Sequence, residues 1–172
     1  MSLSGKLGKS YSEVKDQAKI KKITVELGEV SFDLKVKIPL KKEMEKIIEQ
    51  ISIPNPKKIE LIYNKYAEPI KKSIEEGGAN FLEVINKEKE TIIVLDNDIV
   101  IEGSSIRQVA TLSAMYENKV EKYFSLLQSE IGEPINESFA EISDEFPEQV
   151  IKHIVEEIEK AIKPTYDSVK KN

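Results

Sequence analysis

Two runs of alternating apolar and polar residues, joined by Gly28 and Glu29, constrain the fold more than any other feature of the sequence. Every second residue is apolar over 23–27 and again over 30–38. Successive side chains of a strand point to opposite faces, so each run has one apolar face. A two-residue link with glycine first suits a type II′ turn, which needs a positive φ at that position. We therefore predict a β-hairpin with one buried face, ending before Pro39, which has no N–H for a strand ladder.

Beyond the hairpin, the apolar residues recur at the spacing of helices. We predict helices over 41–52, from about 57 to 76, over 81–85, from Ser104 or Ser105 to about 129, around 139–142, and from Pro147 to the residue before Pro164. The second of these helices contains Pro69, which we expect to kink or divide it near Ala67. A second hairpin is predicted over 92–101.

Length and composition indicate one folded domain with two extensions. The chain has 172 residues, of which 40% are hydrophobic and 33% charged, and a chain of this length buries a core without disulfides. We predict a flexible basic N-terminal arm over 1–21, a single α+β domain over 22–164 and a C-terminal tail over 165–172. The arm is either an electrostatic tether or a solvated terminus. The expected fold is mostly helical, with an N-terminal and a central β-hairpin.

Several classes of function are excluded or disfavoured by composition. The chain has no cysteine and one histidine, which excludes thiolate catalysis, disulfides, cysteine-ligated zinc and any Ser-His-Asp triad not built on His153. A net charge of −5 argues against a nucleic-acid-binding domain. No run of about 18 apolar residues and no signal-peptide pattern is present, so we expect a cytoplasmic protein that neither crosses nor binds a membrane.

Two polar features invite a chemical reading. The triplet Asp96, Asn97 and Asp98 has the alternating oxygen ligands that Ca²⁺ or Mg²⁺ prefers, but these residues also suit a hairpin turn. We favour the turn and expect no metal, cofactor or catalytic residue. Arg107 either clamps a carboxylate bidentately or is a surface arginine on a helix.

The last helix carries more branched apolar residues than a narrow buried stripe requires. This excess indicates either heavy burial in the core or an apolar edge for a partner or for self-association. The residues predicted to bind a partner are Val150, Ile154, Ile158, Ile162 and Tyr166.

The order of five segments resembles one viral protein family. These segments are Lys35-Val36-Lys37-Ile38-Pro39-Leu40 at the end of the hairpin, Asp98-Ile99-Val100-Ile101-Glu102-Gly103-Ser104-Ser105-Ile106-Arg107, Tyr123-Phe124-Ser125-Leu126-Leu127, Asp144-Glu145-Phe146-Pro147-Glu148-Gln149-Val150, and Ile162-Lys163-Pro164-Thr165-Tyr166. With this pattern, roughly residues 22–170 resemble the tail assembly chaperones of long-tailed bacteriophages. The segment with Phe146 and Pro147 and the closing Pro164-x-Tyr166 element are the most specific parts.

This resemblance implies a non-enzymatic protein of the bacterial host cytoplasm. Members of the family bind and solubilise the tape-measure protein, assist polymerisation of the tail-tube protein, and are absent from the mature virion. The resemblance therefore implies the tape-measure and tail-tube proteins as partners, and we expect a homo-oligomer. Two alternatives remain open: a structural tail or head-tail connector protein retained in the virion, and a small magnesium-dependent enzyme that uses Asp96 and Asp98.

Overall fold

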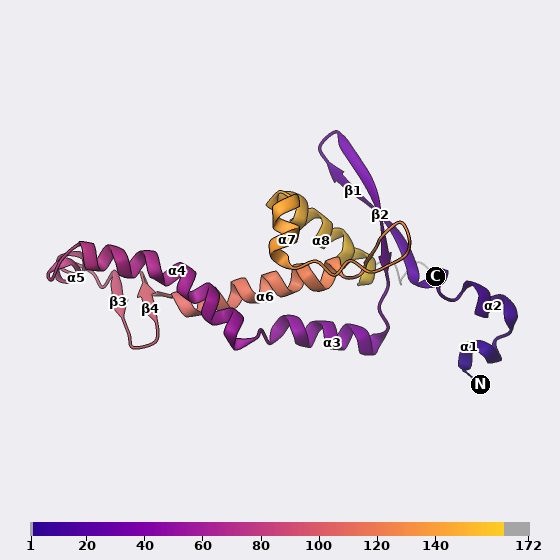
Figure 1. Ribbon diagram of the computed structural model, residues 1–172, viewed down its shortest axis with the longest axis horizontal. Helices are drawn as coiled ribbons and strands as arrows, with labels where there is room; N and C mark the ends of the chain where they lie inside the picture. The colour runs from indigo at the N-terminus through magenta and orange to yellow at the C-terminus, as the bar shows by residue number, and fades with distance from the viewer. Residues whose placement is uncertain (1, 164–172) are drawn as a thin grey trace. The chain divides into compact units, whose positions relative to one another are not determined.

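The computed structural model describes residues 2–163, which form two compact units (Figure 1). The first unit combines the residues up to Ile48 with those from Lys119 onward, and the second is Glu49–Asn118. The second unit is therefore inserted into the first along the chain. The range 22–164, predicted as one domain, includes all of the second unit and most of the first. The predicted tail over 165–172 lies outside the described residues.

The first unit contains the predicted N-terminal hairpin, which is confirmed. Strand β1 (Ile20–Leu27) pairs with β2 (Val30–Lys37) in antiparallel register, with Leu27 opposite Val30. Gly28 has a φ of 64°, and Glu29 has a negative φ, as a type II′ turn requires. Val25 and Val36 are fully buried on one face. Strand β2 ends two residues before Pro39, so the predicted stop is also correct.

A third strand joins this sheet from a distant part of the sequence. Helix α6 (Ile106–Phe124) ends earlier than predicted, and β6 (Leu127–Gln128) pairs with the open edge of β2. The N–H of Lys37 also donates to the carbonyl of Leu126 at 2.8 Å. The prediction of a helix to about residue 129 is wrong because pairing with β2 satisfies backbone groups and buries Leu126 and Leu127.

Two helices complete the folded part of the first unit. Helix α8 (Glu148–Ile162) packs against β1, and α7 (Phe139–Glu145) precedes it (Figure 1). Helix α3 (Lys41–Ser52) agrees with the predicted range, contains the boundary between the two units after Ile48, and has no buried residue. The predicted arm contains α1 (Leu3–Lys6), α2 (Lys9–Val14) and a 3₁₀ turn over Gln17–Lys19, all without a buried residue. The arm is therefore locally helical and solvent-exposed.

The second unit is built on α4 (Pro56–Glu76) and the first part of α6. Its buried core consists of Ile62, Tyr63, Ala67, Ile99, Ala110 and Ala114. Helix α4 runs through Pro69 without division, so of the two predicted effects of this proline, a kink or a division, the division does not occur. Ile70, beyond the proline, packs against the same core as Tyr63, which holds both halves of the helix together. Short helix α5 (Phe81–Ile85) follows as predicted.

The central hairpin is confirmed and extends to a third strand. Strands β3 (Ile92–Val94), β4 (Ile99–Ile101) and β5 (Ser104–Ser105) form an antiparallel sheet in that order. Glu102 and Gly103 connect β4 to β5 and have φ values of 48° and 81°. Positive φ at both central positions is the mark of a type I′ turn. The predicted α+β class with two hairpins is thus observed.

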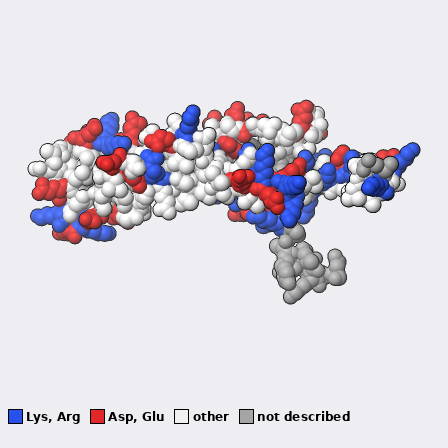
Figure 2. Space-filling view, turned by 90° about the horizontal axis from the view of Figure 1, so that it is seen from below, with Lys and Arg blue, Asp and Glu red and all other residues white. Residues whose placement is uncertain are grey.

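Charged side chains are numerous on the face of the molecule shown in Figure 2. On the face shown in Figure 2, basic and acidic side chains are interspersed rather than separated by sign. The helices of residues 2–163 include none with the length and hydrophobicity that a bilayer crossing requires.

Candidate binding pocket

The residues predicted to bind a partner differ in burial. Ile154 and Ile158 are 1% and 0% exposed, so both contribute to the core of the first unit. Val150 and Ile162 are half-buried, and Tyr166 lies outside the described residues. Helix α8 uses its broad apolar face to cover β1, and Ile154 also lines an apolar pocket described below, so partner binding by these residues stays a prediction.

The carboxylate of Asp98 organises the central hairpin and the start of α6. Its Oδ1 accepts hydrogen bonds from the N–H groups of Ile99 and Arg107 at 2.8 and 2.9 Å, and its Oδ2 accepts one from the Ser105 hydroxyl. Partial burial opposes ionisation, but these hydrogen bonds outweigh it and lower the pKa of Asp98. Such an arrangement supports the interpretation of 96–98 as a turn. Among residues 2–163, no three His, Cys, Asp or Glu side chains are grouped to hold a metal ion.

Ser105 and Arg107 complete the same arrangement. The Ser105 hydroxyl accepts a hydrogen bond from the N–H of Gln108 at 3.0 Å, which makes Ser105 the N-cap of α6, one of the two predicted caps. Arg107 contacts a carboxylate through one nitrogen, not bidentately: its Nη1 lies 2.7 Å from Oε2 of Glu60, and its Nε donates to the carbonyl of Asn97. Both contacts lie within the second unit and hold the hairpin turn and α4 to α6.

An apolar pocket of about 220 Å³ opens in the first unit. Its lining combines the hairpin, the end of α6, β6, the loop before α7, α7 itself and α8. The apolar lining residues are Phe32, Leu34, Phe124, Leu127, Ile135, Ile142, Phe146 and Ile154. The rings of Phe124 and Phe146 meet edge to face, with centroids 6.1 Å apart. A void of about 150 Å³ is enough to hold benzene in other proteins, so this pocket has room for one large apolar side chain.

The polar lining of this pocket is acidic. Glu137, Glu141 and Glu145 belong to it and are all solvent-exposed. Glu141 and Glu145 are four residues apart and thus neighbours on one face of α7, where like charges repel. Within the described residues, Glu137 and Glu145 form no ion pair. We refer to Glu137, Glu141 and Glu145 as the acidic rim.

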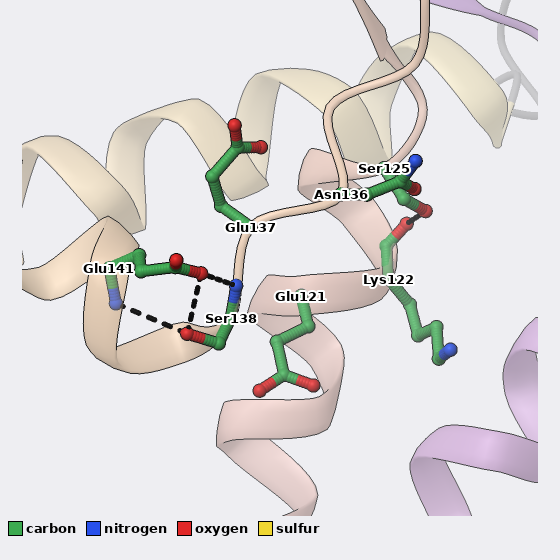
Figure 3. Close-up of a pocket in the computed structure, with 7 residues that line it drawn as sticks. All are labelled: Glu121, Lys122, Ser125, Asn136, Glu137, Ser138 and Glu141. Atoms are coloured by element: carbon green, nitrogen blue, oxygen red, sulfur yellow. Dashed lines mark hydrogen bonds between the residues drawn. The ribbon is translucent and has the colours of Figure 1, made fainter.

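A second, polar pocket shares part of the acidic rim (Figure 3). It is lined by Glu121, Lys122 and Ser125 of α6 and by Asn136, Glu137, Ser138 and Glu141 around the start of α7. Glu141 closes a capping box with Ser138, whose N–H and hydroxyl donate to Oε2 at 2.7 and 2.8 Å. These hydrogen bonds, led by the one from the N–H of Ser138, lower the pKa of Glu141. The capping box therefore fixes the position of Glu141 in the acidic rim, and the lowered pKa keeps its carboxylate ionised at neutral pH.

The arrangement suits recognition of an apolar side chain that projects from a basic segment.

Sequence reasoning missed the pocket, because its lining comes from segments up to 122 positions apart, between Phe32 and Ile154. The available signals were local: Ser138 and Glu141 have the spacing of a capping box, and Phe146 belongs to a segment that the resemblance singled out. Comparison of the chain with protein-family models, with curated proteins and with solved structures gave no match.

Proposed function

We propose that the chain is a non-enzymatic tail assembly chaperone of a long-tailed bacteriophage. In this role it acts in the host cytoplasm, binds and solubilises the tape-measure protein, and assists polymerisation of the tail tube. The resemblance of the sequence motifs suggests the family. The observation that carries the proposal is the apolar pocket with its acidic rim, because it offers a receptor for amphipathic helical segments.

The chemistry of the pocket fits a long helical client. A helix that must be kept soluble presents apolar side chains in a stripe, often flanked by lysine or arginine. One such side chain enters the pocket, and a neighbouring cation meets the acidic rim. A single site of this size binds weakly, but a long client with many stripes binds many copies, and avidity then holds the complex.

Co-expression with the tape-measure protein encoded beside the chain tests the proposal. The variant Glu137→Lys with Glu145→Lys reverses charge at two rim residues that form no ion pair in the described structure. We expect it to reduce the soluble tape-measure protein at least fivefold. The matched control is Glu130→Lys with Asp144→Lys, which makes the same charge change at exposed residues outside the pocket. Equal solubility with both variants would contradict a role for the pocket in client binding.

Mass spectrometry of purified virions distinguishes the chaperone from a structural protein. A chaperone is displaced when the tube polymerises, so its peptides are expected to be absent from the finished particle. Recovery at a fixed copy number would instead identify a tail or connector protein. The gene order gives an independent check: a tail-tube gene is expected upstream and a very long helix-coding gene downstream.

A further inference from the structure

The predicted N-terminal arm has solvent-exposed apolar side chains on both of its short helices. Leu3 and Leu7 are four residues apart on α1 and its C-cap, and Tyr11 and Val14 are three residues apart on α2. Gly8, with a φ of 99°, separates the two helices, so the four residues form two pairs, which we together call the stripe. All four side chains are exposed, with fractions from 43% for Tyr11 to 75% for Leu3. Nothing in the described part of the chain covers this stripe.

A lysine accompanies each apolar pair. Lys6 is three residues from Leu3 on α1, and Lys15, the C-cap of α2, is four residues from Tyr11, so each lysine lies on the same side of its helix as an apolar residue. Neither lysine forms an ion pair among residues 2–163. The arm therefore has the chemistry for which the apolar pocket is suited: large apolar side chains with cations beside them.

We propose that the arm of one copy of this chain docks in the apolar pocket of a second copy. The stripe supplies a side chain, Leu7 or Tyr11, for the roughly 220 Å³ void. Lys6 and Lys15 lie against the acidic rim and relieve the repulsion between Glu141 and Glu145. The pocket is the one used in the proposed function, so an arm from a second copy competes with the client.

Charge complementarity and the nature of the two surfaces favour this occupant. The arm and the pocket rim carry opposite charges, and the arm's apolar side chains gain burial only by docking. Two copies can exchange arms reciprocally, or the copies can join in an open series, because each copy carries one arm and one pocket.

Sedimentation velocity of the full chain over a concentration series up to about 1 mM tests the proposal. The mass of the wild-type chain is expected to rise with concentration from 19.5 kDa. The arm variant Leu7→Glu with Tyr11→Glu and the rim variant Glu137→Lys with Glu145→Lys should each associate at least tenfold more weakly. The matched controls are Ser12→Glu with Gln17→Glu, which add the same two negative charges to exposed positions of the same arm outside the stripe, and Glu130→Lys with Asp144→Lys. Both controls should associate like the wild type.

Mixing the two deficient variants gives the decisive result. The arm variant keeps an intact pocket, and the rim variant keeps an intact arm, so the mixture is expected to form a 1:1 complex that neither forms alone. No complex in the mixture, or a wild-type chain that stays monomeric up to about 1 mM, would overturn the proposal. If the wild-type chain stays monomeric and its arm is protected from proteolysis, each arm fills the pocket of its own chain.

This inference rests on the same pocket as the proposed function, but the two fail separately. The arm variant should still solubilise the tape-measure protein, and more effectively than the wild type, because its pocket is vacant. Loss of self-association in neither variant, together with loss of client solubility in the rim variant, would refute arm docking alone. Normal self-association through the arm with no effect on the client would refute the chaperone role alone.

Discussion

The guanidinium carbon of Arg107 lies 4.0 Å from the centroid of the Tyr63 ring, and its Nη1 lies 2.7 Å from the carboxylate of Glu60. Tyr63 is buried in the core of the second unit, at 4% exposure. The cation thus covers the core side chain while its Nε reaches the carbonyl of Asn97 in the hairpin turn. Arg107 thus links α4, the ring of Tyr63 and the hairpin turn. We therefore expect substitution of Arg107 to lower the stability of the second unit.

We predict that Arg107→Lys lowers the free energy of unfolding of the second unit by about 1–2 kcal/mol, because lysine cannot both stack and donate to Asn97. Urea unfolding followed by tyrosine fluorescence and circular dichroism measures the effect. Lys71→Met is the control, since the Lys71 ammonium lies 5.8 Å from the same ring and should contribute less than about 0.5 kcal/mol. Equal losses at both positions would contradict the special role of Arg107.

Asp98→Asn is expected to destabilise the protein in a pH-dependent way. The pKa of Asp98 is lowered in the fold from its ordinary value of 3.8, so its carboxylate contributes stability above about pH 4, and this contribution is lost as the pH falls through the folded pKa. The loss in Asp98→Asn should be about 1–2 kcal/mol at pH 7 and shrink toward zero in strong acid. Unfolding curves from pH 7 to pH 2 measure it.

The control for Asp98 is Asp96→Asn. The side chain of Asp96 makes no hydrogen bond in the described structure and is exposed, so this change should cost less than about 0.5 kcal/mol. A bound divalent ion detected by calorimetry in the wild type but not in Asp98→Asn would instead favour the magnesium alternative.

Glu102→Asn is expected to stabilise the protein. Glu102 has a φ of 48° at the first central position of the turn between β4 and β5, a left-handed conformation that asparagine adopts more readily. The expected gain is about 0.5–1 kcal/mol, seen as a higher midpoint in thermal unfolding. At the turn between β1 and β2, Glu29 has a negative φ, so Glu29→Asn should give no such gain.

Ile158→Ala separates a core role from a partner-binding role in α8. Removing a fully buried isoleucine should cost about 2–5 kcal/mol of unfolding free energy. Val150→Ala, at a half-buried position of the same helix, should cost about 1 kcal/mol or less. Denaturant unfolding checks both variants. A stable Ile158→Ala protein with impaired client binding would favour the partner-binding role of this residue.

Local signals were sufficient for several elements of the fold. The alternation on both sides of Gly28 and Glu29, the prolines that bound the helices and Ser105 as a cap each act within a few residues, so their positions could be predicted. The early end of α6 could not be predicted, because Leu127 fits the helical pattern of the sequence but is drawn into a strand by pairing with the distant Val36. The unbroken α4 depends likewise on a core around Tyr63 that periodicity does not reveal.

The candidate pocket was beyond sequence reasoning for a similar reason. Apolar residues in α8 could be recognised, but whether Ile154 faces a partner or the core depends on the hairpin packed against that helix. In the sequence, the residues of the acidic rim cannot be distinguished from other charged surface residues. Only the approach of Phe32, Phe124 and Phe146 in space gives Glu137 and Glu145 an apolar neighbour.

The pairing of β2 with β6 has a consequence for synthesis on the ribosome. Val36 and Leu127 are about ninety residues apart, and translation at about 5–20 residues per second separates their emergence by roughly 5–20 s. During this interval the inserted Glu49–Asn118 unit can fold, while the edge of β2 in the nascent hairpin stays unpaired and can pair with strands of other chains. Codon changes that slow translation between the two strands should therefore increase misassembly of newly made chains without altering the stability of the finished protein.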